Sequence, residues 1–316
     1  MDINTLITRP KAELHIHLEG SLEPQMMCAL AKRNNTKLKY NSIEEIYQSY
    51  KFNNLQEFLD LYYLGMSVLQ TEQDYFDLTY AYLTKAHDNN VTHCEMFFDP
   101  QAHIERGVTL SNVINGIWQA IIKARDTYKI HASLIPCFLR HLSENNALKT
   151  FDNLMHFRDK IIGIGLDSTE LGNPPIKFKN LFNRARQEKL KLVAHIGEEG
   201  PAQYVWDALD ILGVDRIDHG NAILSDITLV KRIAKENIAL TMCPLSNYCL
   251  KVTSDLSKHP ALELLNHGVT VTINSDDPAY FGGYVNKNYI ELSHGLNLST
   301  SEIQNLIQNS LDAKFI

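Results

Sequence analysis

The 316-residue sequence lacks the features of membrane and secreted proteins. No apolar run approaches the length that a membrane-spanning helix requires. The first four residues, MDIN, contain neither a basic region nor the apolar stretch that would follow it in a secretory signal. With 44% hydrophobic and 21% charged residues, the composition is that of an ordinary globular protein. We therefore expect a soluble, cytoplasmic protein.

Clustered basic residues are missing as well. The formal net charge is -7, and lysine and arginine do not gather in any segment. Because nucleic acids and anionic membranes both require a basic surface, we expect neither of them as a partner. A small-molecule partner fits this composition better. The sequence leaves the formation of a homo-oligomer open.

The cysteines form no disulfide or zinc-binding pattern. They are odd in number and scattered, and three lie in apolar, strand-like runs. Such residues are typical of a reduced core. The cysteines are Cys28, Cys94, Cys137, Cys243 and Cys249. His93 and Glu95 match the first half of one zinc-enzyme signature, but its second half, P-C-x-x-C, is absent, so we interpret both as strand residues.

Eight short apolar runs recur along the chain, and segments with helical periodicity lie between most of them. The runs span residues 12–18, 91–98, 131–139, 161–166, 190–196, 216–219, 238–243 and 269–274. Strands that alternate with helices indicate parallel pairing, because a parallel return needs a long crossover. No linker, charge block or repeat divides the chain. We predict an α/β fold with one domain, residues 1–316, formed by a (β/α)₈ TIM barrel; a doubly wound sheet is the alternative.

The gap between the first two runs is longer than one crossover requires. We predict extra helices inserted after the first strand, at about residues 20–88. Apolar residues recur there at helical spacing, a pattern typical of core packing. These residues are Phe52, Leu55, Phe58, Leu59 and Tyr62. An inserted segment of this kind can also form the wall or lid of a pocket.

Two histidines in the first run point to a metal site. Chemistry in a barrel collects at the carboxyl ends of the strands and in the loops that follow. His15 and His17, in AELHIHLEGSL, are two residues apart, so both imidazoles project from the same side of a strand. Neutral imidazole is a good zinc ligand. Alone, this pair is a weak signal.

Polar residues at other strand ends strengthen the prediction. His195 ends the fifth run and Glu198 follows it, while His219 ends the sixth run. Asp276 and Asp277 end the eighth run, in INSDDPAYFGG. Each has a structural explanation when taken alone, as a buried histidine, a solvated loop residue or a turn-forming aspartate. Their convergence on one rim favours a metal site.

The residue types at this rim limit the metal. Three histidines and one carboxylate suit zinc, and iron and manganese also fit this kind of ligand. A pair of metals would usually need a bridging carboxylate or modified lysine after the middle strands. The fourth run, IIGIGLDS, offers no lysine. We therefore expect one metal ion.

Five motifs, in order from residue 11 to about residue 284, resemble the adenosine/adenine deaminase family of metal-dependent (β/α)₈ hydrolases. They are AELHIHLEGSL, HIGEEGP, RIDHG, CPLSN and NSDDPAYFGGY. Five motifs in order are far more specific than any one of them. The details CFLRHLSE, DSTELGNPP and DPAYFGGY resemble the branch of the family that acts on free adenine.

The resemblance implies a role for each rim residue. One zinc ion per chain would be held by His15, His17, His195 and Asp276. Glu198 would protonate the purine ring nitrogen beside carbon 6, and His219 would orient and deprotonate the attacking water. Asp277 would hydrogen-bond the ring from its five-membered side. Attack at carbon 6 would expel ammonia and convert adenine to hypoxanthine, a reaction of purine salvage.

The substrate is less defined than the reaction. The nucleoside branch of the family has a small glycine where this chain has Glu170, a bulkier anion that would fill the volume of a ribose. Adenosine and N6-substituted adenines remain alternative substrates on the same fold. A non-catalytic purine-binding protein is an alternative of another class. Glu198 and His219 argue against it, because binding alone requires no proton donor.

Overall fold

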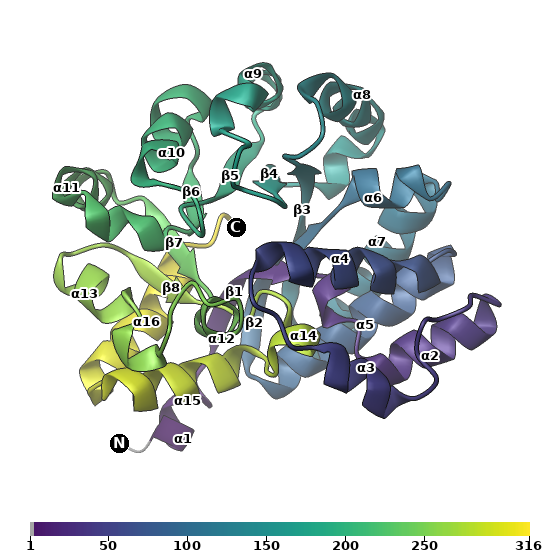
Figure 1. The fold of residues 1–316 in the computed structure, drawn as a ribbon, viewed down its shortest axis with the longest axis horizontal. Coiled ribbons are helices and arrows are strands. Elements are labelled where there is room, and N and C mark those ends of the chain that lie inside the picture. Colours follow the sequence, from purple (N-terminus) through teal and green to yellow (C-terminus); the bar gives the residue numbers. More distant parts are fainter. Residues whose placement is uncertain (1–2) are drawn as a thin grey trace.

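A computed structural model describes residues 3–316 and contains eight parallel strands in the order β1-β2-β3-β4-β5-β6-β7-β8 (Figure 1). The strands are β1 Lys11–His17, β2 Val91–Phe98, β3 His131–Leu139, β4 Gly163–Asp167, β5 Lys191–Ile196, β6 Arg216–His219, β7 Ala239–Met242 and β8 Val271–Ile273. An isolated bridge from Ile16 to Asp276 joins the end of β8 to β1. The predicted (β/α)₈ barrel is confirmed, and the doubly wound alternative is wrong.

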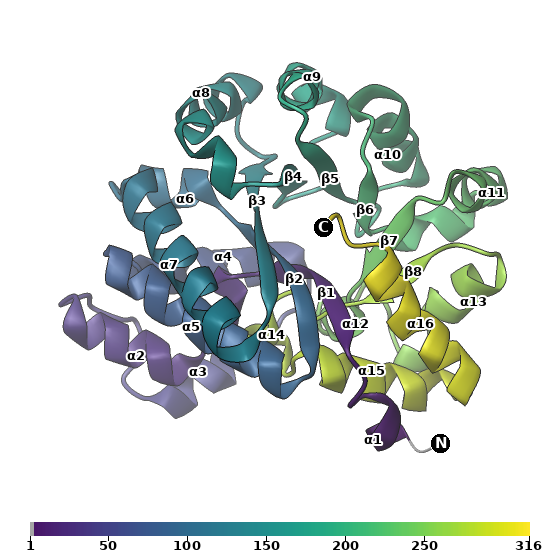
Figure 2. The same ribbon diagram turned by 180° about the vertical axis from the view of Figure 1, so that it is seen from behind.

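Helices surround the strands in both views (Figures 1 and 2). They are α1 Ile3–Leu6, α2 Pro24–Arg33, α3 Ile43–Ser49, α4 Leu55–Gly65, α5 Glu72–Asp88, α6 Pro100–Glu105, α7 Leu110–Tyr128, α8 Glu144–Leu154, α9 Lys179–Gln187, α10 Ala202–Asp207, α11 Ile227–Glu236, α12 Pro244–Cys249, α13 Ala261–Asn266, α14 Pro278–Phe281, α15 Val285–Leu296 and α16 Thr300–Asp312. Side-chain caps begin several of them. Thr71 and Asp74 form a capping box at α5, and Asp226 accepts two backbone N–H groups at α11. Within residues 3–316, no helix has the length and apolar character needed to cross a membrane.

Four helices, α2 to α5, lie between β1 and β2, where the sequence predicts extra helices. Asn54 caps α4 by accepting the backbone N–H of Glu57. The predicted apolar stripe is buried and packs against Tyr280 and Phe281, which follow β8. Helix α4 therefore lies across the end of the barrel at which β8 terminates. The single-domain organisation stays a prediction.

The amino end of the barrel is closed by buried charges and by the C-terminal segment. Arg216, the first residue of β6, pairs with Glu95 at 2.6 Å between Nη1 and Oε2. The backbone N–H of Phe315 donates to the other oxygen of Glu95, and the Arg216 guanidinium lies 4.3 Å from the centre of the Phe315 ring. Figure 2 shows the C-terminus beside this end of the strands. Glu95 is thus a strand residue with a structural role, as the sequence predicts.

Candidate active site

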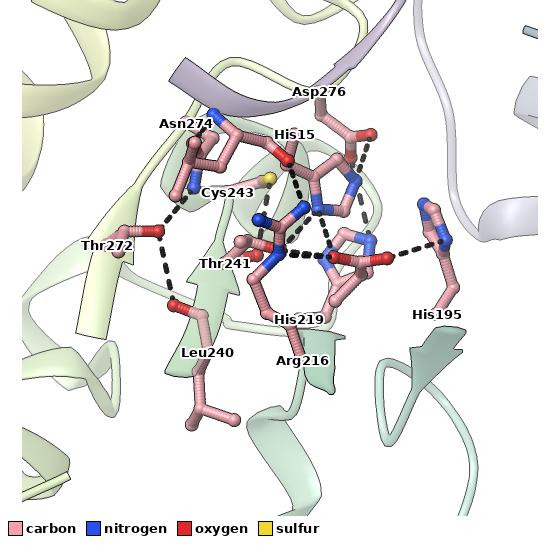
Figure 3. A network of polar contacts seen from close by, with 12 residues as sticks. His15, His195, Arg216, His219, Leu240, Thr241, Cys243, Thr272, Asn274 and Asp276 are labelled. Carbon is pink, nitrogen blue, oxygen red and sulfur yellow. Dashed lines mark hydrogen bonds and ion pairs between the residues drawn. The ribbon is translucent and has the colours of Figure 1, made fainter. Parts of the chain in front are cut away.

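The predicted metal ligands lie together at the carboxyl end of the barrel. His15 and His17 lie on one side of β1. His195 lies near the end of β5, and Asp276 follows β8. His17 Nε2 is 2.9 Å from His195 Nε2 and 3.5 Å from Asp276 Oδ1. His15 Nε2 is 3.1 Å from the same aspartate oxygen. Figure 3 shows His15, His195 and Asp276 converging with His219.

These residues fit a zinc ion by chemistry and spacing. Zinc binds imidazole and carboxylate at about 2.0–2.2 Å in a tetrahedron, so its ligand atoms lie about 3.3 Å apart. The three distances between ligand atoms, 2.9, 3.1 and 3.5 Å, lie close to that value. The structure also brings His219 within reach, since ligand atoms of His15, His195, His219 and Asp276 all lie within 4.8 Å of one another. The assignment of His17 as a ligand, with His219 left free, stays a prediction.

The ring of His15 is fixed by a buried chain of hydrogen bonds. Its Nδ1 is 2.9 Å from Thr241 Oγ1, and that hydroxyl donates to Asp218 Oδ1 at 2.7 Å. A partner at Nδ1 leaves Nε2 directed at Asp276, the arrangement found around metal-binding histidines. Neither Asp218 nor Thr241 is among the site residues predicted from the sequence. Asp218 lies in RIDHG, where a carboxylate inside a short buried strand was an available signal.

Two of the predicted site residues have a strained backbone. His219 has a φ of 68° and Asp276 a φ of 62°, both in the left-handed region that residues other than glycine rarely adopt. Such conformations cost roughly 1–3 kcal/mol and concentrate at functional sites. Here they occur where β6 and β8 end. The strained backbone therefore occurs at the two positions where the His219 and Asp276 side chains enter the site.

Glu198 and His219 have the electrostatics of an acid and a base. His219 Nε2 lies 3.6 Å from Glu198 Oε2 and 3.8 Å from Asp276 Oδ2. Burial lowers the pKa of His219 to about 3, so its ring is neutral at neutral pH. Burial, reinforced by Asp276, raises the pKa of Glu198 well above its usual range. A protonated carboxyl beside a neutral imidazole can donate one proton and accept another.

Asp277 lines a cavity together with Glu198 and His219. Its Oδ1 is buried and has no hydrogen-bond partner among the described residues. Burial, with the neighbouring Asp276, raises the pKa of Asp277 well above its usual range. Gly20 makes room for this side chain, because a Cβ at Gly20 would lie 1.9 Å from Asp277 Oδ1. The glycine after Glu19 therefore belongs to the construction of the site.

Glu170 lies beside the cavity and is not one of its lining residues. Its carboxylate is 1% exposed and accepts the backbone N–H groups of residues 197–200, at 2.7 to 3.0 Å. Glu170 thus holds the loop that carries Glu198. The sequence holds no signal for this role, because every residue other than proline carries a backbone N–H and its acceptor depends on the fold. The predicted contact of Glu170 with the substrate stays a prediction.

The inserted helix α4 forms one wall of the cavity, as the sequence allows. The lining residues from α4 are Leu55, Phe58, Leu59, Tyr62 and Tyr63. On other sides the cavity is lined by Asp99 after β2, Asp167 at the end of β4 and Ser168. None of these three residues is among the site residues predicted from the sequence. Their position at strand ends follows the rule that identified the histidines.

Comparisons with known proteins agree with this site. The adenosine deaminase family model matches residues 10–316. An adenine deaminase of Pseudomonas putida (strain GB-1) is 54% identical over 307 residues, which are 97% of this chain and 98% of the relative. A crystal structure of adenine deaminase from Arthrobacter aurescens is 48% identical, with a TM-score of 0.96 over 97% of this chain and 94% of that one. An amidohydrolase from Burkholderia ambifaria with bound zinc is 26% identical, with a TM-score of 0.91 over 99% of this chain and 88% of that one. The chain therefore belongs to the adenosine deaminase family.

Proposed function

We propose that this chain catalyses the hydrolytic deamination of adenine to hypoxanthine and ammonia, a step of purine salvage. The observation that carries the proposal is the approach of Glu198 Oε2 to within 3.6 Å of His219 Nε2 beside a buried cluster of candidate metal ligands, with the pKa of Glu198 raised and that of His219 lowered by burial. The names of the Pseudomonas putida and Arthrobacter aurescens relatives support adenine as the substrate.

One zinc ion would be held by the four residues that the family resemblance implies. These are His15, His17, His195 and Asp276. Bound zinc would polarise a water and lower its pKa to about 7, which supplies a nucleophile at neutral pH. The zinc reported for the Burkholderia ambifaria structure supports this choice of metal. A ratio of one zinc per chain is part of the proposal.

The remaining site residues handle protons and orient the ring. Glu198 donates a proton to the ring nitrogen beside carbon 6, which makes that carbon more electrophilic. His219 accepts a proton from the attacking water, since its ring is neutral at neutral pH. Asp277 hydrogen-bonds the five-membered side of the ring through its unpaired carboxyl group. The apolar side chains of α4 cover one side of the cavity.

Deamination of adenine and adenosine, followed by ultraviolet absorbance on the zinc-loaded protein, tests the proposal. We expect turnover of adenine and little turnover of adenosine. Glu198→Gln keeps the shape of the side chain and removes its acidic proton, so kcat should fall by about 10²- to 10⁴-fold. A preference for adenosine would contradict the free-base assignment. N6-methyladenine, assayed in parallel, addresses the N6-substituted alternative.

A non-catalytic purine-binding protein would behave differently in the same assay. It would bind adenine when loaded with zinc and release no ammonia. The buried acid and base argue against that function, because neither group is needed for binding. The cytoplasmic location and a homo-oligomeric state stay predictions.

A further inference from the structure

Two carboxyl groups in the cavity have no role in the proposed chemistry. Asp99 follows β2 and Asp167 ends β4, and their exposed fractions are 1% and 3%. Both line the cavity that contains Glu198 and Asp277. Ligand atoms of Asp99, Asp167 and His17 lie within 4.8 Å of one another. The inference below rests on the proposed function and concerns the part of the substrate that these carboxyl groups face.

Their oxygens are available to a ligand. The carboxyl groups of Asp99 and Asp167 hydrogen-bond each other, which requires a shared proton, and Oδ1 of each is buried with no other hydrogen-bond partner within residues 3–316. The hydroxyl of Tyr62, a separate lining residue on α4 that is 3% exposed, is unpaired in the same way. Buried polar groups are usually satisfied in proteins. Three polar groups that line one cavity and retain unused hydrogen-bonding capacity indicate a bound molecule with polar atoms.

The order of the strands indicates which edge of a purine lies there. Passing around the barrel from β5 through β4, β2 and β1 to β8, the cavity presents Glu198, Asp167, Asp99 and Asp277. Passing around a purine from N1, the nitrogens are N3, N9 and N7. Glu198 serves N1 and Asp277 serves the five-membered side in the proposed function. The N3 to N9 edge then faces the carboxyl groups on β4 and after β2.

We propose that the free oxygens of Asp99 and Asp167 accept the N9–H of an unsubstituted purine and thereby select free bases over nucleosides. A base carries a hydrogen-bond donor at N9, whereas a nucleoside carries a sugar carbon there. A nucleoside would leave the two buried oxygens unpaired. Sites that hydrogen-bond a substrate reject an analogue lacking that group by as much as 10⁴- to 10⁵-fold. This selection needs no side chain to fill the space of the ribose.

The test compares adenine with 9-methyladenine, which differs by one methyl group at N9. Wild-type protein should show a kcat/KM for adenine at least about 10³-fold higher. Asp99→Ala and Asp167→Ala should each lower kcat/KM for adenine by about 10- to 100-fold and leave the value for 9-methyladenine unchanged or raised. Asp60→Asn, an exposed position on α4, is the matched control and should change neither value.

Three results would overturn the inference. One is a wild-type ratio below about 10-fold, which is decisive even when the alanine variants fail to fold. Another is an equal loss for both substrates in the variants. The third is a metal content of two ions per chain in the wild type that falls to one in the alanine variants. That result would mean that His17, Asp99 and Asp167 hold a second cation. A zinc-loaded wild type that deaminates neither base would contradict the proposed function itself.

Discussion

Asp276 and Asp277 are adjacent in the sequence, yet their carboxyl groups have opposite electrostatics. Burial acts to raise the pKa of Asp276, but the neighbouring His15 and His219 hold it well below its usual range. The pKa of Asp277 lies well above its usual range, because of burial and then of Asp276. The pKa values of the two carboxyl groups are therefore shifted in opposite directions, which favours one ionised and one protonated group. Two adjacent anions avoid repulsion in this way.

Conservative variants of the two aspartates should separate their roles. Asp276→Asn removes an anionic ligand, so we expect a lower zinc content after purification. Asp277→Asn should retain zinc and lower kcat/KM for adenine by about 10²- to 10³-fold, the usual cost of losing one group that stabilises a transition state. Metal analysis together with steady-state kinetics measures both effects. Equal loss of zinc in the two variants would contradict separate roles.

Single residues also mark the limit of what the sequence predicts. The histidines and aspartates of the rim were identifiable because strand ends can be located from apolar runs. The contact between Asp218 and Thr241 was not, since it depends on the register between β6 and β7, which places Asp218 opposite Thr241. Periodicity indicates where a strand ends, but not which side chains meet across the barrel.

At the scale of elements, the loop after β5 is held by its neighbours. Glu170 accepts the N–H groups of residues 197–200, and Arg140 Nη1 donates to the carbonyl oxygen of His195 at 2.6 Å. The same Arg140 nitrogen lies 3.9 Å from Glu170 Oε1. Glu170 and Arg140 therefore fix the loop on both sides of the turn that carries Glu198. This arrangement gives Glu170 a positioning role.

Substitution of Glu170 tests that role. Glu170→Gln places an amide NH₂ against N–H donors, so we expect the free energy of unfolding to fall by at least about 1–3 kcal/mol. We also expect kcat for adenine to fall by about 10- to 100-fold with little change in KM, because the proton donor is misplaced while the cavity persists. Denaturant unfolding and steady-state kinetics measure these changes. Glu188→Gln, an exposed residue after α9, is the control.

The alternative role of Glu170 makes a different prediction for a smaller side chain. If Glu170 fills the volume of a ribose, Glu170→Gly should gain activity on adenosine. If Glu170 only positions the loop, the same variant should lose activity on adenine and gain none on adenosine. The contacts of the Glu170 carboxylate favour the second result, because both of its oxygens already accept backbone N–H groups of the loop.

Element types were more predictable than their contacts. The runs at 12–18 and 91–98 match β1 and β2 to within one residue at each end, and the inserted helices occur where the long gap predicts them. The docking of α4 on the cavity was not derivable from its apolar stripe. That stripe is equally consistent with ordinary core packing, and only the contacts with Tyr280 and Phe281 define its position.

At the scale of the whole molecule, the candidate metal site connects strands that are far apart in the sequence. Its residues come from β1, β5 and the segment after β8. Their imidazole and carboxylate groups are almost completely buried. Buried polar groups without partners are costly. A metal bound there would both satisfy these groups and link the beginning, middle and end of the chain.

Metal removal should therefore destabilise the entire fold. A ligand at about 100 times its Kd stabilises the folded state by about 2.7 kcal/mol, which in a chain of this size corresponds to a Tm shift of about 4 °C. We expect a chelator to lower Tm by this amount and added zinc to restore it, as measured by calorimetry. Asp276→Asn, which lacks a ligand, should show a smaller response to both treatments. An unchanged Tm after complete metal removal would mean that the strands hold together without the ion, and that the buried cluster serves the chemistry alone.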